Sequence, residues 1–397
     1  MERVRPVVSY VLLSSAAALG LWGAFVFSRR AAPPIVEDKP PVVIQKVQPQ
    51  HRPKVDVVFV LDTTGSMSSL LSGAKRKIWE MARFIAQGQP APELRIGLVA
   101  YRDKGDEYVT KFFDLTDDID GVYQNLTSFA AGGGGDTPEH VAQALHEAVY
   151  NSHWSDGKNT LKLIYLVGDA PPHTDYDDGY DYRAIAKDAI RKGIRINAVR
   201  CGSDDGTRQT FTEIASLAGG DFSSIDQSGG MADVRTPFDE ELARLNRALT
   251  ETAIPWGDEE RRSLLRKKAE VNMAAPIEAQ AERAGYFGLA KTRGRAAATS
   301  DGDLLDDVTN KKVDVAALKP AALPEPMQKM DEGERKNYLA EKRKAREEVL
   351  NQINSVAARR DAYLKNAAAA APASKDGFDG KVRATMKKQA AEVGVAY

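Results

Sequence analysis

Oxygen-bearing side chains follow an apolar run near the start of the chain, in the stretch "VVFVLDTTGSM". Asp62 ends the run, and the hydroxyls of Thr64 and Ser66 come at the next alternate positions. Two later stretches carry groups of the same kind: Thr137 lies in "GGGGDTPEH", and Asp169 lies in "YLVGDAPPH". Carboxylate and hydroxyl oxygens are hard ligands, which suit Mg²⁺, Mn²⁺ or Ca²⁺ and suit zinc poorly. These five residues therefore form a candidate site for a divalent cation.

The charges of this oxygen set agree with a site that stays open to an acidic ligand. The carboxylates of Asp62 and Asp169 together balance the charge of one divalent cation, and the three hydroxyls add no charge. A further carboxylate is then not repelled by the loaded site.

Each part of the set also has a simpler interpretation. Ser66 and Thr137 are residue types that cap helix N-termini, and Pro138 would suit the first helical position after Thr137. Asp62 and Asp169 could be ordinary aspartates at strand ends. The glycines at 132–135 are not a Walker A loop, because no Gly-Lys-Ser/Thr follows them.

The residues around these loops predict alternating strands and helices from residue 55 to about residue 250. Helices that bring the chain back between strands imply a doubly wound, mostly parallel sheet covered on both faces. Ligands of such sheets bind at the carboxyl ends of the strands, where the three oxygen-bearing loops lie. The expected strands are 55–61, 94–101, 111–115 (a short edge strand), 161–167, 194–199 and 222–225. The expected helices are 67–85, 141–149, 211–217 and 238–249.

Asp62-x-Thr64-x-Ser66, Thr137 and Asp169 resemble the metal-ion-dependent adhesion site of von Willebrand factor type A domains. The usual motif of that family is Asp-x-Ser-x-Ser, so Thr64 is a departure that keeps the hydroxyl. The resemblance covers residues 54–250. It implies a Rossmann-like fold in which the three hydroxyls approach the metal, while Asp62 and Asp169 bind it directly or through water. It also implies that an acidic side chain of a protein partner completes the coordination.

On this basis we expect an adhesion-like, non-enzymatic protein that binds a partner through Mg²⁺, Mn²⁺ or Ca²⁺. One alternative is a haloacid-dehalogenase-type phosphatase with Asp62 as the nucleophile, since "LDTTGS" and "VGD" also resemble loops of that family. That family usually has a second aspartate after "GD", where this chain has Ala170. Another alternative is a metal that only stabilises an interface between subunits.

Charged and aromatic residues beside the site could select the partner. We expect a partner-binding rim that includes Arg102, Asp136, His173 and Asp175. A solvated loop with turn-forming aspartates is the alternative for the acidic stretch after His173.

The N-terminus predicts a membrane anchor. Residues 7–27 are uncharged, and about 21 residues at ~1.5 Å each can cross a ~30 Å hydrocarbon layer. Arg29 and Arg30 stand where a cleavage site would be, which favours an uncleaved span (1–30) over a signal peptide. The proline-rich stretch 31–53 then reads as a tether. We therefore expect a single-pass cell-membrane protein with its domain outside the cytoplasm.

The part of the chain after residue 250 has a different pattern. Residues 251–330 read as a mixed helical and irregular connector. Residues 331–397 read as a helical hairpin, because Val349, Ile353 and Val356 form a narrow apolar stripe of coiled-coil type on a highly charged helix. That stripe suits packing against another helix, in the chain or in a partner.

Composition limits the classes of partner. The chain has 55 basic and 56 acidic residues, a balance that does not indicate nucleic-acid binding. Cys201 is the one cysteine of the sequence, so a disulfide within the chain and a cysteine-based metal cluster are excluded.

Overall fold

The computed structural model describes residues 52–135, 137–231, 234–292, 296–370 and 377–397. Residues 1–50 and 51–397 are separate units. The expected anchor, residues 7–27, and nearly all of the proline-rich stretch lie outside the described residues. Within the described residues, no helix has the length and apolar character needed to span a membrane.

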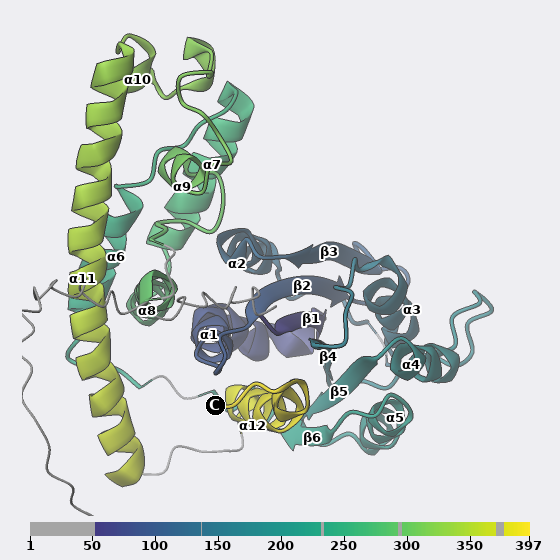
Figure 1. Cartoon of the computed structure of the whole chain (residues 1–397). Helices are drawn as coiled ribbons and strands as arrows, with labels where there is room; N and C mark the ends of the chain where they lie inside the picture. The colour runs from purple at the N-terminus through teal and green to yellow at the C-terminus, as the bar shows by residue number, and fades with distance from the viewer. Residues whose placement is uncertain (1–51, 136, 232–233, 293–295, 371–376) are drawn as a thin grey trace, which may run out of the picture. The chain divides into compact units, whose positions relative to one another are not determined.

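A six-stranded sheet organises the first half of this unit, in the order β3-β2-β1-β4-β5-β6 (Figure 1). Every neighbouring pair is parallel except β2 and β3, which are antiparallel. This is the mostly parallel α/β sheet that the sequence predicts, with β3 at one edge. The strands are β1 (Lys54–Asp62), β2 (Glu93–Tyr101), β3 (Thr110–Thr116), β4 (Thr160–Gly168), β5 (Ile194–Cys201) and β6 (Phe222–Ile225).

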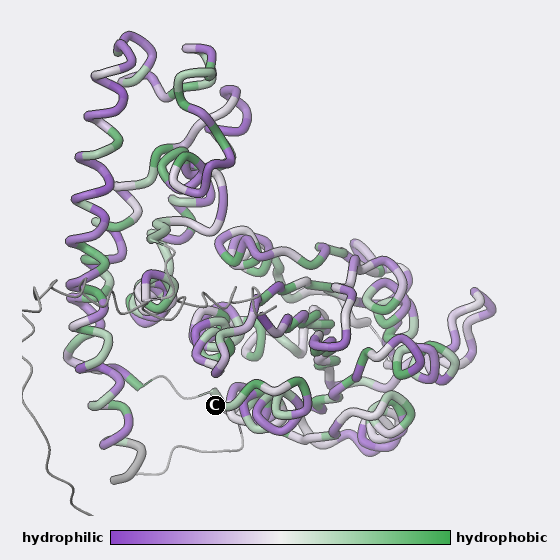
Figure 2. The backbone as a smooth tube through the Cα atoms, in the orientation of Figure 1, coloured by the Kyte–Doolittle hydropathy of each residue, from purple (hydrophilic) through white to green (hydrophobic). Residues whose placement is uncertain are grey.

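The central strands are apolar on both faces, which is why their sequences are nearly continuous hydrophobic runs. Along β1, Val57 and Phe59 belong to the hydrophobic core on one side of the sheet, and Val58 and Val60 belong to the core on the other side. In Figure 2 hydrophobic residues are concentrated along the strands, whereas α11 (Glu332–Ala370) is largely hydrophilic.

Helices cover both faces of this sheet. The helices α3, α4 and α5 share a core with one face, and α1, α2 and α12 share a core with the other. The helices α2 and α4 were not among those expected from the sequence, although each has an aspartate at its N-cap, Asp118 and Asp181. The covering helices are α1 (Ser68–Ala86), α2 (Ile119–Ser128), α3 (Val141–His146), α4 (Tyr182–Arg191), α5 (Asp205–Leu217) and α12 (Phe378–Ala390).

The helix α12 comes from the end of the chain and packs on the sheet. The ring of Phe378 lies 6.3 Å from that of Phe59 on β1, and Tyr165 on β4 donates a hydrogen bond to the backbone oxygen of Val382. The expectation of a hairpin over residues 331–397 has to be corrected, because α12 buries its apolar face against the sheet. A fragment of residues 54–250 would lack this cover.

The remaining helices form a second group, called here the helical region (residues 239–370). The helix expected at residues 238–249 is α6 (Asp239–Thr250), which packs mainly against α8 and α11. The expected connector, residues 251–330, is largely helical. The helices are α6 (Asp239–Thr250), α7 (Glu259–Met273), α8 (Ile277–Thr292), α9 (Leu304–Thr309), α10 (Glu325–Gln328) and α11.

The apolar stripe of α11 packs within the chain. Leu350, Ile353 and Val356 are buried in the core that also contains α6 and α8. Buried ion pairs join the same elements: Glu282 on α8 pairs with both Arg83 on α1 and Arg360 on α11. Burial alone would raise the pKa of Glu282, but these two guanidinium groups lower it below its ordinary value. The helical region is therefore fixed to α1.

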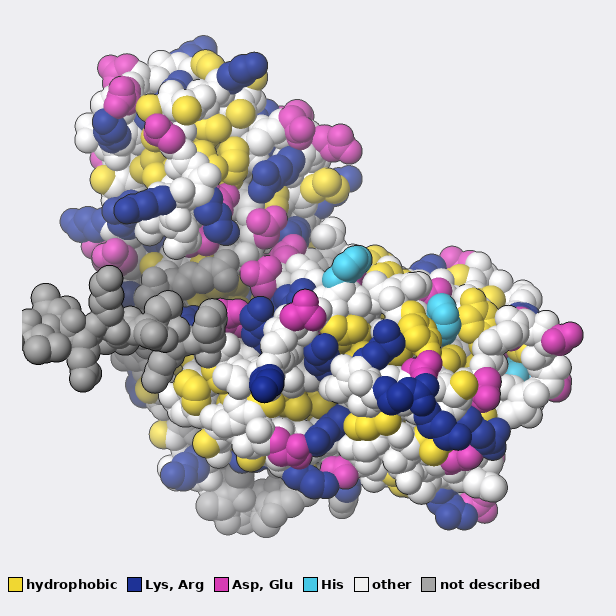
Figure 3. Space-filling view, turned by 45° about the vertical axis from the view of Figure 1, so that its right-hand side comes forward, with side chains coloured by type: hydrophobic (Ala, Val, Ile, Leu, Met, Phe, Trp, Pro, Cys, Tyr) yellow, Lys and Arg dark blue, Asp and Glu magenta, His cyan; other side chains and the backbone are white. Residues whose placement is uncertain are grey.

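Acidic and basic side chains are interspersed on the face drawn in Figure 3. This distribution agrees with the formal net charge of −1.

Candidate metal site

The first oxygen-bearing loop is organised around Asp62, the last residue of β1. Oδ1 of Asp62 accepts hydrogen bonds from the backbone nitrogen and from Oγ1 of Thr64, at 2.8 and 2.6 Å. Oγ1 of Thr64 in turn lies 3.3 Å from Oγ of Ser66. The loop therefore places the carboxylate and both hydroxyls at one point beyond the sheet.

Ser66 does not cap a helix. It lies inside a 3₁₀ turn, Gly65–Met67, and α1 begins after it with Met67 at the N-cap position. The capping interpretation of Ser66 is therefore wrong. Its side chain is at the exposed edge of the site, where a ligand could reach it.

Asp169 follows β4, the strand next to β1. Because Leu61 pairs with Val167 in the parallel register, the loops after β1 and β4 leave the sheet side by side. Oδ2 of Asp169 accepts a hydrogen bond from Nε2 of Gln227 at 2.5 Å, and its backbone oxygen accepts one from Oγ1 of Thr207. Gln227 was not among the site residues expected from the sequence.

The environment of Asp62 disfavours an ionised carboxylate unless a cation compensates its charge. The residue is fully buried, and its Oδ2 has no hydrogen-bond partner among the described residues. Burial, together with the negative charge of Asp169, raises its pKa to about 7, despite the hydrogen bonds from Thr64. A divalent cation between the two carboxylates would remove this penalty, so these residues fit a metal.

Thr137 lies in a loop tied to the first one. Gly132 donates a backbone hydrogen bond to Thr63, and Gly65 donates one to Gly133. Thr137 is exposed, and α3 starts only at Val141, with His140 as its N-cap. The N-cap interpretation of Thr137 is therefore wrong, and so is the first helical position for Pro138.

Glu139 is an acidic residue of the site that sequence reasoning missed. It is 3% exposed, and its Oε2 has no hydrogen-bond partner in the described part of the chain. Its backbone is held by Pro171, whose oxygen accepts from the nitrogen of Glu139 at 2.9 Å. Burial and the charge of Asp62 raise the pKa of its carboxyl to about 9. The position of Glu139 in the sequence, two residues after Thr137, was the feature that could have indicated its role in the site.

The ligand set depends on hydroxyls. No group of three His, Cys, Asp or Glu side chains is arranged to hold a metal ion within the described residues. Two carboxylates and the hydroxyls of Thr64 and Ser66 are the ligands that the loops bring together. Such oxygen ligands suit a hard cation.

The expected rim residues have different roles. Arg102 is 4% exposed and donates hydrogen bonds to the backbone oxygens of Thr63 and Ala130, so it holds two loops in place and is no rim residue. Asp175 is exposed and contacts Nδ1 of His173 at 2.8 Å. The His173 ring stacks on Tyr176 at 4.0 Å. Asp136 lies outside the described residues.

The site geometry does not favour Asp62 as a nucleophile. Both of its oxygens are inside the protein, and one of them is covered by two hydrogen bonds from Thr64. The sequence also lacks the second aspartate that usually follows "GD" in that family, because Ala170 stands there.

Comparisons with known proteins agree with this fold. Residues 56–232 match the family model described as von Willebrand factor A domain. The chain is 36% identical over 123 residues to von Willebrand factor A domain-containing protein 7 of Rattus norvegicus, covering 30% of this chain and 12% of that protein. The chain thus spans only 11–12% of the length of such curated relatives.

Two solved structures are similar to this chain at low sequence identity. BatB from Bacteroides thetaiotaomicron is 18% identical, covers 43% of this chain and 90% of its own, and has a TM-score of 0.33. Proximal thread matrix protein 1 from the mussel byssus, in a structure with a zinc-occupied MIDAS motif, is 14% identical. It covers 44% of this chain and 42% of its own, with a TM-score of 0.33.

The strand order, the loops at the carboxyl ends of the strands and the family match lead to one assignment. Residues 56–232 match the von Willebrand factor A domain family and fold into its mostly parallel α/β sheet; domains of that family typically mediate protein interactions.

Proposed function

We propose that this domain binds a protein partner through a divalent cation held by Asp62, Thr64, Ser66, Thr137 and Asp169. The observation that carries the proposal is Oδ2 of Asp62, a fully buried carboxylate oxygen without a hydrogen-bond partner among the described residues, beside a second carboxylate. A cation compensates such a pair. Mg²⁺ is the first candidate, with Mn²⁺ and Ca²⁺ as substitutes.

The partner we propose is a protein with an exposed Asp or Glu side chain. When bound, the cation supplies a coordination position for that carboxylate. Without the cation, the carboxyl groups of Asp62 and Asp169 offer no positive charge to an approaching carboxylate. Partner binding should therefore require the cation, and a chelator should abolish it.

Titration calorimetry of the full chain with Mg²⁺ and Mn²⁺ tests the cation site. We expect one site in the wild-type chain and none in Asp62→Ala. Unchanged affinity in Asp62→Ala would overturn the proposal. The same samples, assayed with a generic phosphate ester and Mg²⁺, test our further proposal that the protein is not an enzyme. Hydrolysis that depends on Asp62 would support the phosphatase alternative.

We also propose that residues 7–27 anchor the protein in the cell membrane, with the domain outside the cytoplasm. The length and lack of charge of that segment support this proposal. Carbonate extraction of membranes should leave the protein in the pellet. Release by carbonate, or a mature chain that begins near Arg29, would contradict it.

A further inference from the structure

Gln227 lies on the loop after β6 and contacts two segments that carry candidate metal ligands. Its Nε2 donates a hydrogen bond to Oδ2 of Asp169 at 2.5 Å and a longer one to the backbone oxygen of Ser66 at 3.4 Å. An ionised carboxylate only accepts hydrogen bonds, so the amide nitrogen must face Asp169. Gln227 thus fixes one oxygen of that carboxylate and leaves the other available to a cation.

The fold makes room for this amide at Gly202. A Cβ atom on residue 202 would lie 2.2 Å from Oε1 of Gln227, and Gly202 has a φ of +73°. The backbone nitrogen of Gly202 also donates to Ile225, the last residue of β6, at 3.0 Å. The end of β5 therefore sets both the position of the loop and the orientation of the glutamine.

The same loop is bound to the C-terminal helix. The backbone nitrogen of Phe378, the first residue of α12, donates to the oxygen of Gly229 at 2.9 Å. The buried ring of Phe378 packs against Phe59, which lies three residues before Asp62 on β1. A segment from the end of the chain thus contacts the strand that carries Asp62 and the loop that carries Gln227.

We propose that Gln227 is a positioning residue for Asp169, and that the docking of α12 keeps Gln227 in place. Cation binding and the docked state of α12 would then stabilise each other, because coupling between two sites is reciprocal. This inference rests on the proposed function, since it needs a cation at Asp62 and Asp169. It adds the C-terminal segment to the scaffold of the site.

Mn²⁺ titration calorimetry of the full chain tests the role of Gln227. Gln227→Met keeps the length and volume of the side chain and removes only the polar amide. We expect its Mn²⁺ affinity to fall about 10- to 100-fold, the usual effect of losing a group that orients a metal ligand. Ser228→Ala is the matched control, because its hydroxyl bonds Asp226 in the same loop. This control should keep wild-type affinity.

Hydrogen exchange of α12 tests the coupling with a readout other than affinity. Saturating Mg²⁺ should slow amide exchange at the start of α12 in the wild-type chain, and this protection should shrink in Gln227→Met. Wild-type affinity in Gln227→Met, or an equal loss in Ser228→Ala, would overturn this inference alone. Failure of the wild-type chain itself to bind Mn²⁺ would overturn the proposed function and this inference together.

Discussion

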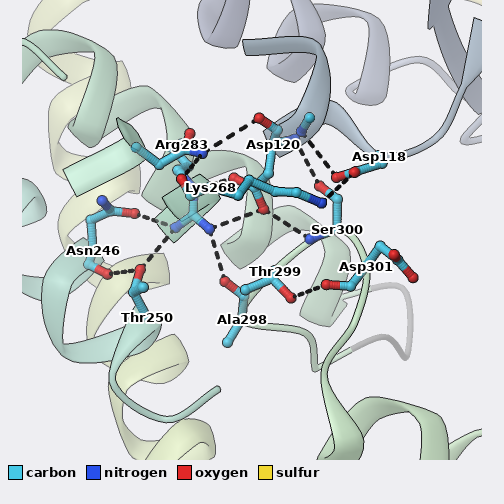
Figure 4. A network of polar contacts seen from close by, with 12 residues as sticks. Asp118, Asp120, Asn246, Thr250, Lys268, Arg283, Ala298, Thr299, Ser300 and Asp301 are labelled. Atoms are coloured by element: carbon cyan, nitrogen blue, oxygen red, sulfur yellow. Dashed lines mark hydrogen bonds and ion pairs between the residues drawn. The ribbon is translucent and has the colours of Figure 1, made fainter. Parts of the chain in front are cut away.

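Arg283 of α8 and Asp120 of α2 form a buried, two-pronged ion pair between the helical region and the von Willebrand factor A domain (Figure 4). Nε and Nη2 of Arg283 donate to Oδ1 and Oδ2 of Asp120 at 2.7 and 3.1 Å. The same guanidinium donates to Asn246 and Thr250 on α6 and to the backbone oxygen of Ala298. All three guanidinium nitrogens of Arg283 and both carboxylate oxygens of Asp120 therefore make hydrogen bonds.

Replacing Arg283 should therefore be costly. Arg283→Met leaves the Asp120 carboxylate buried without its partner, and we expect the free energy of unfolding to fall by about 3–5 kcal/mol. Arg208→Met is the control, because its pair with Asp205 is exposed; there we expect a loss within about 1 kcal/mol. Denaturant unfolding of the full chain measures both. Equal effects of the two changes would contradict this assignment.

The variant Thr137→Val tests whether Thr137 is a metal ligand or has only a structural role. Because His140 caps α3, loss of the Thr137 hydroxyl should leave the stability of the metal-free protein unchanged. If Thr137 approaches the cation, Mg²⁺ affinity should fall sharply, as in Asp62→Ala. Calorimetric titration measures the Mg²⁺ affinity, and thermal unfolding without metal measures the stability of the metal-free protein. A destabilised metal-free variant with normal Mg²⁺ affinity would remove Thr137 from the ligand set.

The stability of the metal-free protein should depend on pH through Asp62. Its folded pKa of about 7 is above the ordinary value of 3.8, so the unfolded chain releases this proton at lower pH. Stability from this group is present below pH ~4 and is lost as the pH rises to about 7. In pH-dependent denaturant unfolding, Asp62→Asn should lack this share of the loss between about pH 4 and pH 7.

Mg²⁺ should restore the stability that is lost when Asp62 ionises, because the cation stabilises the ionised carboxylate. The gain in melting temperature on adding saturating Mg²⁺ should be larger at pH 8 than at pH 5. A gain that does not change with pH, or one that persists in Asp62→Asn, would show that the cation binds elsewhere.

Two neighbouring residues of α12 test its docking on the sheet. Met386 is fully buried and Lys387 is exposed. Met386→Ala should cost about 2–5 kcal/mol of unfolding free energy through the cavity it leaves, and Lys387→Ala should change it by no more than about 0.5 kcal/mol. If α12 were a free arm, denaturant unfolding would find both variants as stable as the wild-type chain.

The local features of this fold could be predicted from the sequence. Apolar runs identify the central strands, such as β1 and β4, because strands inside a parallel sheet are buried on both faces. The Asp62 loop is also local: the two hydrogen bonds from Thr64 to Asp62 span two residues. The fold class, the edge position of β3 and the loops that meet at one end of the sheet follow from such short-range patterns.

The contacts between distant segments were decided only in three dimensions. Gly285 and Gly288 look like interruptions of a helix, yet α8 is continuous there. A Cβ on Gly285 would lie 2.6 Å from Nε of Arg83, and one on Gly288 would lie 2.5 Å from Oδ1 of Asn354. These glycines let α1 and α11 come close to α8, a requirement that helix periodicity does not express.

The residues that support the site also come together only through contacts between distant segments. Glu139 and Gln227 join Asp62 and Asp169 only because loops from separate strands end at one edge of the sheet. The last cover of that sheet, α12, is supplied by a segment that follows the whole helical region. The sequence alone determined most of the helices and strands that form, because their formation depends on neighbouring residues. Which elements pack against one another was decided only by the tertiary structure, because packing depends on complementary apolar faces and buried charges from distant segments.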